Sequence, residues 1–240
     1  MGNLDSPTQF TRERQRPRAE EGPLEIVYED EAVLALYKPA GQVVHPTYKH
    51  PTGTLLNAVL WRLRDRRDAQ PGILTRLDKD TSGLVVIGLT PGVHAGLQRQ
   101  MAAGLVGKAY LAIVDGTPRP ASGRIVLPLG RSAEDRRIVV VKEDGAYSET
   151  RYEVIAHADP LSLVRCELVT GRTHQIRVHL RARGWPVLGD RVYGKADDRI
   201  GRQALHAWRV TLAHPVSRQP LELTARVPDD MRQFGFDFGA

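Results

Sequence analysis

The sequence predicts an α+β fold, in which a mixed and mainly antiparallel β-sheet carries flanking helices. Two observations predict it. Apolar runs of strand length, rich in Val, Ile, Leu and Tyr, outnumber the segments with helical spacing, and turn-forming residues separate these runs. No internal repeat or low-complexity tract interrupts the series. At 240 residues the chain can bury a core, and we expect one folded domain over residues 24–240.

The first 23 residues are expected to form a disordered tail. They contain few apolar side chains and no usable periodicity. Arginine occupies every second position from Arg12 to Arg18, but acidic residues are interleaved with these arginines. A solvated leader is therefore favoured over a phosphate-binding arm.

The first elements after the tail are a hairpin and a helix. Two β-rich runs, residues 24–28 and 32–37, flank the acidic turn at residues 29–31, as a hairpin would. Between residues 54 and 64 the leucines and Val59 recur at helical spacing, and arginines occupy the far side or the end.

A strand followed by a helix comes next. Residues 84–89 form a strand-like apolar run. Thr90 is a good N-cap, and Pro91 suits the first helical position because proline lacks the amide hydrogen that is unused there. The helix should end near Gly104.

Strands dominate the second half of the chain. Further β-rich runs occupy residues 109–114, 137–141, 150–155, 161–169, 208–212 and 221–227. One more helix is expected there, with Thr173 as its cap, running through Leu180 to Gly184.

Charge and cysteine content restrict the partners and the compartment. The net charge of +6 and a pI near 9.7 favour a polyanionic partner, because Lys and Arg that neutralise phosphates release counterions. The single cysteine, Cys166, cannot form an internal disulfide, which fits the reducing cytoplasm. The chain lacks an apolar run of the roughly 18 residues that a membrane span needs, and its polar start does not resemble a secretory signal.

The segment from residue 75 to residue 83 is a polar, turn-rich loop that leads into the strand at residues 84–89. A loop fixed by a sheet can project a side chain into a cleft, which suits a catalytic carboxylate at Asp78. By residue type alone, Asp78 could equally bind loop amides, and Ser82 could be a turn residue.

Five groups of residues resemble the motifs of the RluA-type pseudouridine synthases, in the same order. They are residues 38–41 (KPAG) with 43–46 (VVHP), 76–78 (RLD) with 81–84 (TSGL), 108–110 (KAY), 171–179 (GRTHQIRVH), and 188–190 (LGD) with 193–194 (YG). The resemblance spans about residues 24–228. It implies the pseudouridine synthase fold and an enzyme that flips a uridine out of rRNA or tRNA and rejoins its base through carbon.

The resemblance implies three catalytic residues. Asp78 matches the family's essential aspartate, and a carboxylate can attack or steer a sugar carbon as the glycosidic bond breaks. Arg177 matches the basic partner that would keep this carboxylate charged inside a pocket. Tyr110 matches the tyrosine that stacks against the extruded uracil. By pattern alone, Arg177 could be a phosphate-binding arginine on the surface and Tyr110 a core residue.

Six further residues are expected to contact RNA: Thr75, Arg76, Lys38, Lys108, Arg172 and His174. The planar guanidinium of Arg76 suits stacking where the flipped base was, although an ion pair with Asp78 or Asp80 is the simpler alternative. The family commonly has histidine where this chain has Thr75, so we expect altered loop packing or RNA contacts there more than lost catalysis.

No cofactor or metal is implied. His174 and His179 are five residues apart, which places them on different helix faces, and no Glu or Cys set completes a zinc site. Phosphate-cradling and dinucleotide-binding glycine motifs are also missing from the sequence. We expect a monomer.

Two other functions fit parts of the pattern. An RNA-binding or RNA-remodelling factor without catalysis would have the same electrostatics, but it has no need for Asp78 in a basic pocket. A base-releasing hydrolase would use Asp78 and Asp80 as an acidic pair. The residues before position 24 are too few for the small RNA-binding domain that many relatives carry. Recognition is therefore expected from the catalytic domain, with candidate basic segments at residues 61–67, 172–183 and 191–209.

Overall fold

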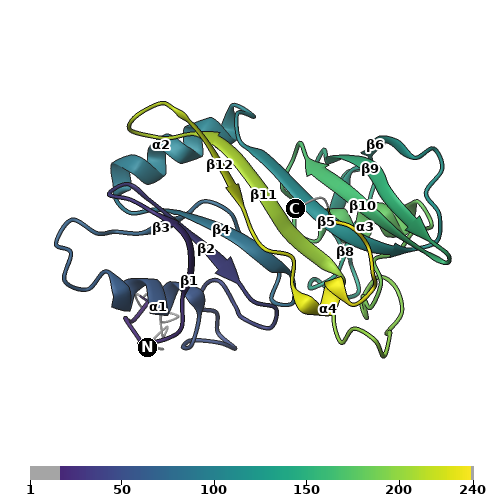
Figure 1. The fold of residues 1–240 in the computed structure, drawn as a ribbon, viewed down its shortest axis with the longest axis horizontal. Coiled ribbons are helices and arrows are strands. Elements are labelled where there is room, and N and C mark those ends of the chain that lie inside the picture. The colour runs from purple at the N-terminus through teal and green to yellow at the C-terminus, as the bar shows by residue number, and fades with distance from the viewer. Residues whose placement is uncertain (1–16, 239–240) are drawn as a thin grey trace, which may run out of the picture.

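One large sheet forms the centre of the fold (Figure 1). The computed structural model describes residues 17–238. The strands of the sheet follow the order β1-β2-β4-β11-β5-β10-β9-β6, with β12 paired to β11 and β3 paired to β4. The bounds are β1 Glu25–Glu29, β2 Val33–Lys38, β3 Gly72–Ile73, β4 Ser82–Gly88, β5 Gly107–Asp115, β6 Ser122–Val126, β9 Glu149–Ala158, β10 Leu161–Leu168, β11 Leu205–Ala213 and β12 Pro220–Thr224. Only β4 and β11 pair in parallel within this sheet of the described chain, so the predicted mixed and mainly antiparallel sheet is confirmed.

Four helices and a small second sheet accompany it over residues 17–238. They are α1 Leu55–Arg62, α2 Pro91–Ala102, α3 Gln175–Ala182, α4 Asp229–Arg232, and the hairpin of β7 Leu129–Arg131 with β8 Val139–Val141. Thr54 caps α1 and exchanges hydrogen bonds with Asn57 in a capping box. Thr90 caps α2 with Pro91 in the first turn, as predicted.

The predicted cap of α3 is wrong. His174, not Thr173, occupies the N-cap position, with a φ of 53° in the left-handed region, and its side chain forms no capping hydrogen bond. The side chain of Gln175 holds the loop instead, since its Oε1 accepts from the amide of Arg172 and from the hydroxyl of Thr170.

Three strands and one helix have no counterpart in the sequence prediction: β3, β6, β7 and α4. The strand β6 reads SGRIV and buries only Ile125, and β7 is three residues long, so neither shows a period-2 apolar pattern. The run at residues 137–141 contributes only β8, in the small sheet.

Strand β4 is buried along its whole length because both of its faces are covered. Leu84 and Val86 pack into one apolar cluster together with Leu97 of α2. Val85 and Ile87 pack on the other face, in the cluster that α1 helps to form. The strand is therefore a rigid base for the loop that precedes it.

The expected tail lies mostly outside the described residues, since residues 1–16 are not among them. Its remaining part, residues 17–23, is held against the N-terminal end of α1 instead of being free. The carbonyl of Arg18 accepts from the Asn57 side chain, the Glu20 amide donates to the Asn57 carbonyl, and the Glu20 carboxylate accepts from the Gly53 amide. Between residues 17 and 238, none of the helices combines the length and the apolar character needed to cross a membrane.

Candidate active site

A cavity of about 740 Å³ lies where the loop before β4, strand β5 and the start of α3 meet. Every residue that the sequence predicts for the site lines it, except Lys38. These residues are Thr75, Arg76, Asp78, Lys108, Tyr110, Arg172, His174 and Arg177. Such a volume falls in the range of small-molecule and nucleotide sites.

The loop that carries Asp78 is fixed at the seam between β4 and β11. Ser82 pairs in parallel with His206, and the Ser82 hydroxyl lies 2.9 Å from His206 Nδ1. Gly83 has a φ of +118°, and a Cβ there would lie 2.1 Å from the Ala207 carbonyl oxygen. Glycine is therefore required where the two strands approach most closely.

Lys38 does not reach the cavity. Its side chain is 0% exposed, and its ammonium donates to the carbonyls of Pro39, Gln42 and Lys79 at 2.8–2.9 Å. All three ammonium hydrogens are thus used inside the protein, so the expected contact with RNA is not available. Lys38 instead ties the end of β2 to the loop that carries Asp78.

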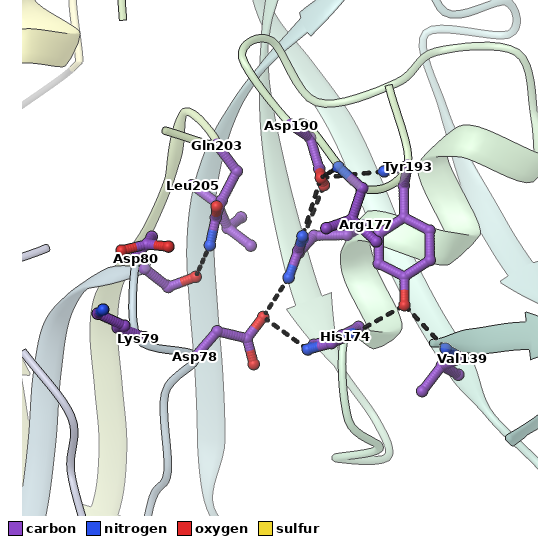
Figure 2. Close-up of polar contacts among 12 residues, drawn as sticks. Asp78, Lys79, Asp80, Val139, His174, Arg177, Asp190, Tyr193, Gln203 and Leu205 are labelled. Atoms are coloured by element: carbon purple, nitrogen blue, oxygen red, sulfur yellow. Dashed lines mark hydrogen bonds and ion pairs between the residues drawn. The ribbon is translucent and has the colours of Figure 1, made fainter. Parts of the chain in front are cut away.

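Asp78 and Arg177 form the ion pair that the sequence predicts, and a second aspartate lies behind the arginine (Figure 2). Arg177 Nη1 donates to Asp78 Oδ2 at 2.9 Å. Its Nε and Nη2 donate to the two oxygens of Asp190 at 2.7 and 2.8 Å. Asp78 is 25% exposed, whereas the Asp190 side chain is fully buried. The arginine is held from inside the protein and offers one edge to the cavity.

Charge compensation keeps Arg177 and Asp190 ionised. Burial works against the charge of Arg177, but hydrogen bonds to Asp190 and the charges of Asp190 and Asp78 outweigh it and raise the Arg177 pKa. Burial likewise works to raise the pKa of Asp190, but the hydrogen bonds and charge of Arg177, with the amides of Tyr193 and Val192, lower it. A cation therefore stands beside Asp78 at every pH near neutrality.

Tyr110 is both a core residue and a cavity wall. Its side chain is buried in the main apolar cluster, and it also lines the cavity. Burial, and then the negative charge of Asp78, raise the pKa of its phenol. The ring therefore offers a neutral, largely apolar surface against which a base can stack.

His174 and Tyr193 connect Asp78 to the small hairpin. His174 Nδ1 lies 2.8 Å from the Tyr193 hydroxyl, and its Nε2 lies 3.8 Å from Asp78 Oδ2. The Tyr193 hydroxyl also accepts from the amide of Val139 on β8 at 2.9 Å (Figure 2). The sequence prediction gave no role to Asp190 or Tyr193, although both stand in the last motif of the resemblance, residues 188–194.

Four basic residues that line the cavity lack carboxylate partners within residues 17–238. They are Arg76, Lys108, Arg172 and Arg131, of which Arg131 was not predicted. The alternative that Arg76 pairs with Asp78 or Asp80 is therefore not realised in the described chain. In the expected basic segments at residues 61–67 and 191–209, by contrast, Arg62, Arg66, Arg199, Arg202 and Arg209 each pair with an acidic residue.

Among the described residues no group of three or more His, Cys, Asp or Glu side chains could hold a metal ion. The chemical groups of the cavity are one carboxylate, a buried guanidinium, an aromatic wall and several cations without carboxylate partners in the described chain. Fold and cavity together fit a class of enzymes that act on a polyanionic substrate.

Comparison with known proteins agrees with this class. The family model described as RNA pseudouridylate synthase matches residues 32–182. The ribosomal large subunit pseudouridine synthase D of Zymomonas mobilis is 41% identical over 226 residues, which cover 88% of this chain and 71% of that protein. An RNA pseudouridine synthase of Bacillus subtilis is 40% identical over 221 residues, which cover 90% of this chain and 73% of that protein.

Solved structures of RNA pseudouridylate synthase domain proteins are also similar to this chain. The human RNA Pseudouridylate Synthase Domain Containing 1 superposes with a TM-score of 0.68 at 28% identity, over 86% of each chain. The human RNA Pseudouridylate Synthase Domain Containing 4 superposes with a TM-score of 0.70 at 22% identity, which shows the shared fold. The chain belongs to the RNA pseudouridylate synthase family. It is an RNA pseudouridine synthase, an isomerase that acts on RNA, and the alternative of a non-catalytic binding factor is not favoured.

Proposed function

We propose that Asp78 performs the chemistry on a uridine of ribosomal RNA that has been flipped into the cavity. The observation that carries the proposal is the position of its carboxylate. Asp78 is the partly exposed member of the Asp190–Arg177–Asp78 series, and it lies in a cavity with an aromatic wall and with cations that have no carboxylate partner in the described chain. A flipped uridine would find a ring to stack on and a carboxylate for its ribose.

The reaction keeps the composition of the uridine, although the hydrogen on C5 is lost and another proton is gained at N1. The carboxylate acts on the ribose, either by attack at C1′ or by removal of the C2′ proton, and the C1′–N1 bond breaks. Uracil turns against Tyr110, and its C5 bonds to C1′. In the first route the C1′–O bond to Asp78 breaks as this bond forms, and in the second route C2′ regains its proton from the Asp78 carboxyl group. The proton leaves C5 and N1 gains one, so the product is an isomer of the substrate. Arg177 compensates the charge of the carboxylate while water is excluded.

The cations at the cavity would hold the RNA backbone. Arg76, Lys108, Arg131 and Arg172 line the cavity, and because none is paired with a carboxylate in the described chain, their charges are free to attract phosphate. In this proposal Arg76 fills the space that the flipped base leaves in the stack. The same residues would bring RNA to a catalytic domain that recognises its substrate without a partner chain.

Two features of the relatives and of the chain complete the proposal. Relatives from Zymomonas mobilis and Nitrosomonas europaea are named for the ribosomal large subunit, which supports ribosomal RNA as the substrate here. We also propose a monomer located in the cytoplasm, since the thiol of Cys166 is buried and free, which fits a reducing compartment. Light scattering of the purified protein and cell fractionation test the last two points.

Tritium release from RNA labelled with [5-³H]uridine tests the proposal. Wild-type protein should release tritium from ribosomal RNA, and Asp78→Asn should release none while its circular dichroism stays unchanged. Asp80→Asn, an exposed change two residues away, is the matched control and should retain activity. Release of tritium from transfer RNA but not from ribosomal RNA would show that the substrate is transfer RNA. Free uracil among the products would instead indicate a hydrolase.

A further inference from the structure

His174 is held in a backbone conformation that L-residues rarely adopt. Its φ of 53° and ψ of 15° place it in the left-handed region, at the start of α3. This conformation costs free energy for a residue with a Cβ, and such residues cluster at functional sites. The conformation aims the imidazole between Tyr193 and Asp78 (Figure 2).

The hydrogen bonds around Tyr193 determine which nitrogen of His174 carries the proton. The amide of Val139 can only donate, and it donates to the Tyr193 hydroxyl oxygen at 2.9 Å. The phenol keeps its own hydrogen, since burial raises its pKa, and His174 Nδ1 lies 2.8 Å away to accept it. Burial also lowers the pKa of His174, so the ring is neutral and its one proton lies on Nε2.

The Nε2–H group and Arg177 approach the same oxygen of Asp78. Arg177 Nη1 lies 2.9 Å from Asp78 Oδ2, and His174 Nε2 lies 3.8 Å from that oxygen. Over residues 17–238, the other oxygen, Oδ1, receives no hydrogen bond. The two oxygens of one carboxylate are thus in different environments.

We propose that His174 is a positioning residue, and that its Nε2–H and Arg177 together fix Oδ2 of Asp78 so that Oδ1 faces the ribose. Tyr193 selects the tautomer that makes this possible. The inference rests on the proposed catalytic role of Asp78, and it replaces the expected role of His174 as an RNA contact.

A second donor has a clear physical purpose. One hydrogen bond from Arg177 leaves the carboxylate free to rotate about its terminal torsion, which is broad for aspartate. A donor on a different element restricts that rotation and fixes which lone pairs face the substrate. The distance of 3.8 Å is that of an open site, and catalytic hydrogen bonds often shorten when the substrate excludes water.

Single-turnover kinetics and RNA binding separate a positioning residue from an RNA contact. The experiment uses the full chain with excess enzyme over labelled ribosomal RNA. It compares wild type, His174→Ala and His174→Gln, whose side-chain amide can place a donor near the position of Nε2. We expect His174→Ala to lower the rate at saturation about tenfold, the effect of one hydrogen bond to a charged group, with an unchanged dissociation constant. His174→Gln should recover most of the rate.

Tyr193→Phe tests the selection of the tautomer. It keeps the ring that lies 4.9 Å from the Arg177 guanidinium but removes the hydroxyl. Its rate should fall between those of wild type and His174→Ala, again with unchanged RNA binding. His157→Ala, an exposed histidine on β9, is the control for loss of an imidazole elsewhere and should behave as wild type.

Each result has one meaning. A weaker dissociation constant with an unchanged rate at saturation in His174→Ala would overturn the inference and restore the RNA contact. Equal rates for His174→Ala and His174→Gln would overturn it as well. Asp78→Asn is measured beside them. If Asp78→Asn is inactive while His174→Ala is fully active, only the positioning role fails, whereas activity in Asp78→Asn refutes the proposed function itself.

Discussion

Arg177 donates two hydrogen bonds to Asp190 but only one to Asp78. The buried aspartate is thus the main partner of the arginine, and the carboxylate in the cavity is the minor one. Asp190 binds Nε and Nη2 of the guanidinium and leaves Nη1 to donate to Asp78. Asp190 therefore supports the arginine that contacts the proposed catalytic residue.

Removal of the Asp190 charge should be costly for activity and for stability. In Asp190→Asn the buried guanidinium loses its charged partner, and breaking such a pair typically costs about 3–5 kcal/mol. We expect the free energy of unfolding, measured in urea, to fall by about that amount, and tritium release to fall about 100-fold in the protein that remains folded.

The matched control is Asp197→Asn. Asp197 also accepts two hydrogen bonds from an arginine side chain, that of Arg199, but this pair lies at the surface. Its loss should cost less than about 1 kcal/mol and leave activity unchanged. Equal costs for the two variants would contradict the structural role given to Asp190.

Arg76 should contribute to the salt dependence of RNA binding. It is exposed at the cavity and has no carboxylate partner in the described chain, so it can release a counterion from RNA. For Arg76→Ala the slope of log Kd against log salt concentration should fall by about 1. Arg66→Ala is the control, because Arg66 already pairs with Asp68, and it should leave the slope unchanged. Identical slopes for Arg76→Ala and wild type would exclude a phosphate contact.

Lys38 should matter for stability and not for RNA affinity. Lys38→Met keeps much of the side-chain volume but leaves three carbonyls without their donor. We expect the free energy of unfolding to fall by roughly 3 kcal/mol in urea titrations, with an unchanged denaturant slope. RNA affinity of the folded protein should not change, and a weaker affinity would restore Lys38 as an RNA contact.

His206 should make the protein less stable in mild acid. Burial, with a smaller contribution from the charge of Arg202, lowers its pKa to about 3 in the folded chain. The unfolded chain has the ordinary histidine pKa of about 6.5 and therefore binds more protons between these two values. Stability from this group is complete above about pH 6.5 and decreases as the pH falls toward 3, by about 2 kcal/mol at pH 5.

Urea titrations at pH 7 and pH 5 measure this effect. The variant His206→Asn keeps an amide near the Ser82 hydroxyl, which lies 2.9 Å from His206 Nδ1, but it cannot titrate in this range. The difference in stability between the two pH values should therefore be smaller in the variant by about 2 kcal/mol. An equal pH dependence in both proteins would show that His206 is not the group responsible.

Local patterns in the sequence predict most of the elements. The spacing of Leu55, Val59 and their neighbours predicts α1, and Thr90 with Pro91 predicts the start of α2, because both signals act within one helical turn. The ordered motifs predict which residues gather at the cavity. The strands that remained undetected, β3, β6 and β7, are short and depend on pairing with other strands.

What the sequence could not predict depends on contacts between distant residues. A lysine after a strand reads as a surface cation, and only the folded loop around Lys38 supplies the three carbonyls that bury it. Asp190 resembles a turn residue until α3 places Arg177 against it. His174 is the N-cap residue in place of the predicted Thr173. Its side chain contacts the hydroxyl of Tyr193, which lies 19 residues later in the sequence.

The pairing of β4 with β11 has a consequence for how the enzyme folds during its synthesis on the ribosome. Asp78 lies before β4, its partner Arg177 comes 99 residues later, and the strand that locks the loop in place, β11, ends only at Ala213. A nascent chain therefore holds its aspartate long before it can orient it. The proposed site is complete only when β11 pairs with β4, so we expect that a shorter product of synthesis or proteolysis that lacks β11 does not modify RNA.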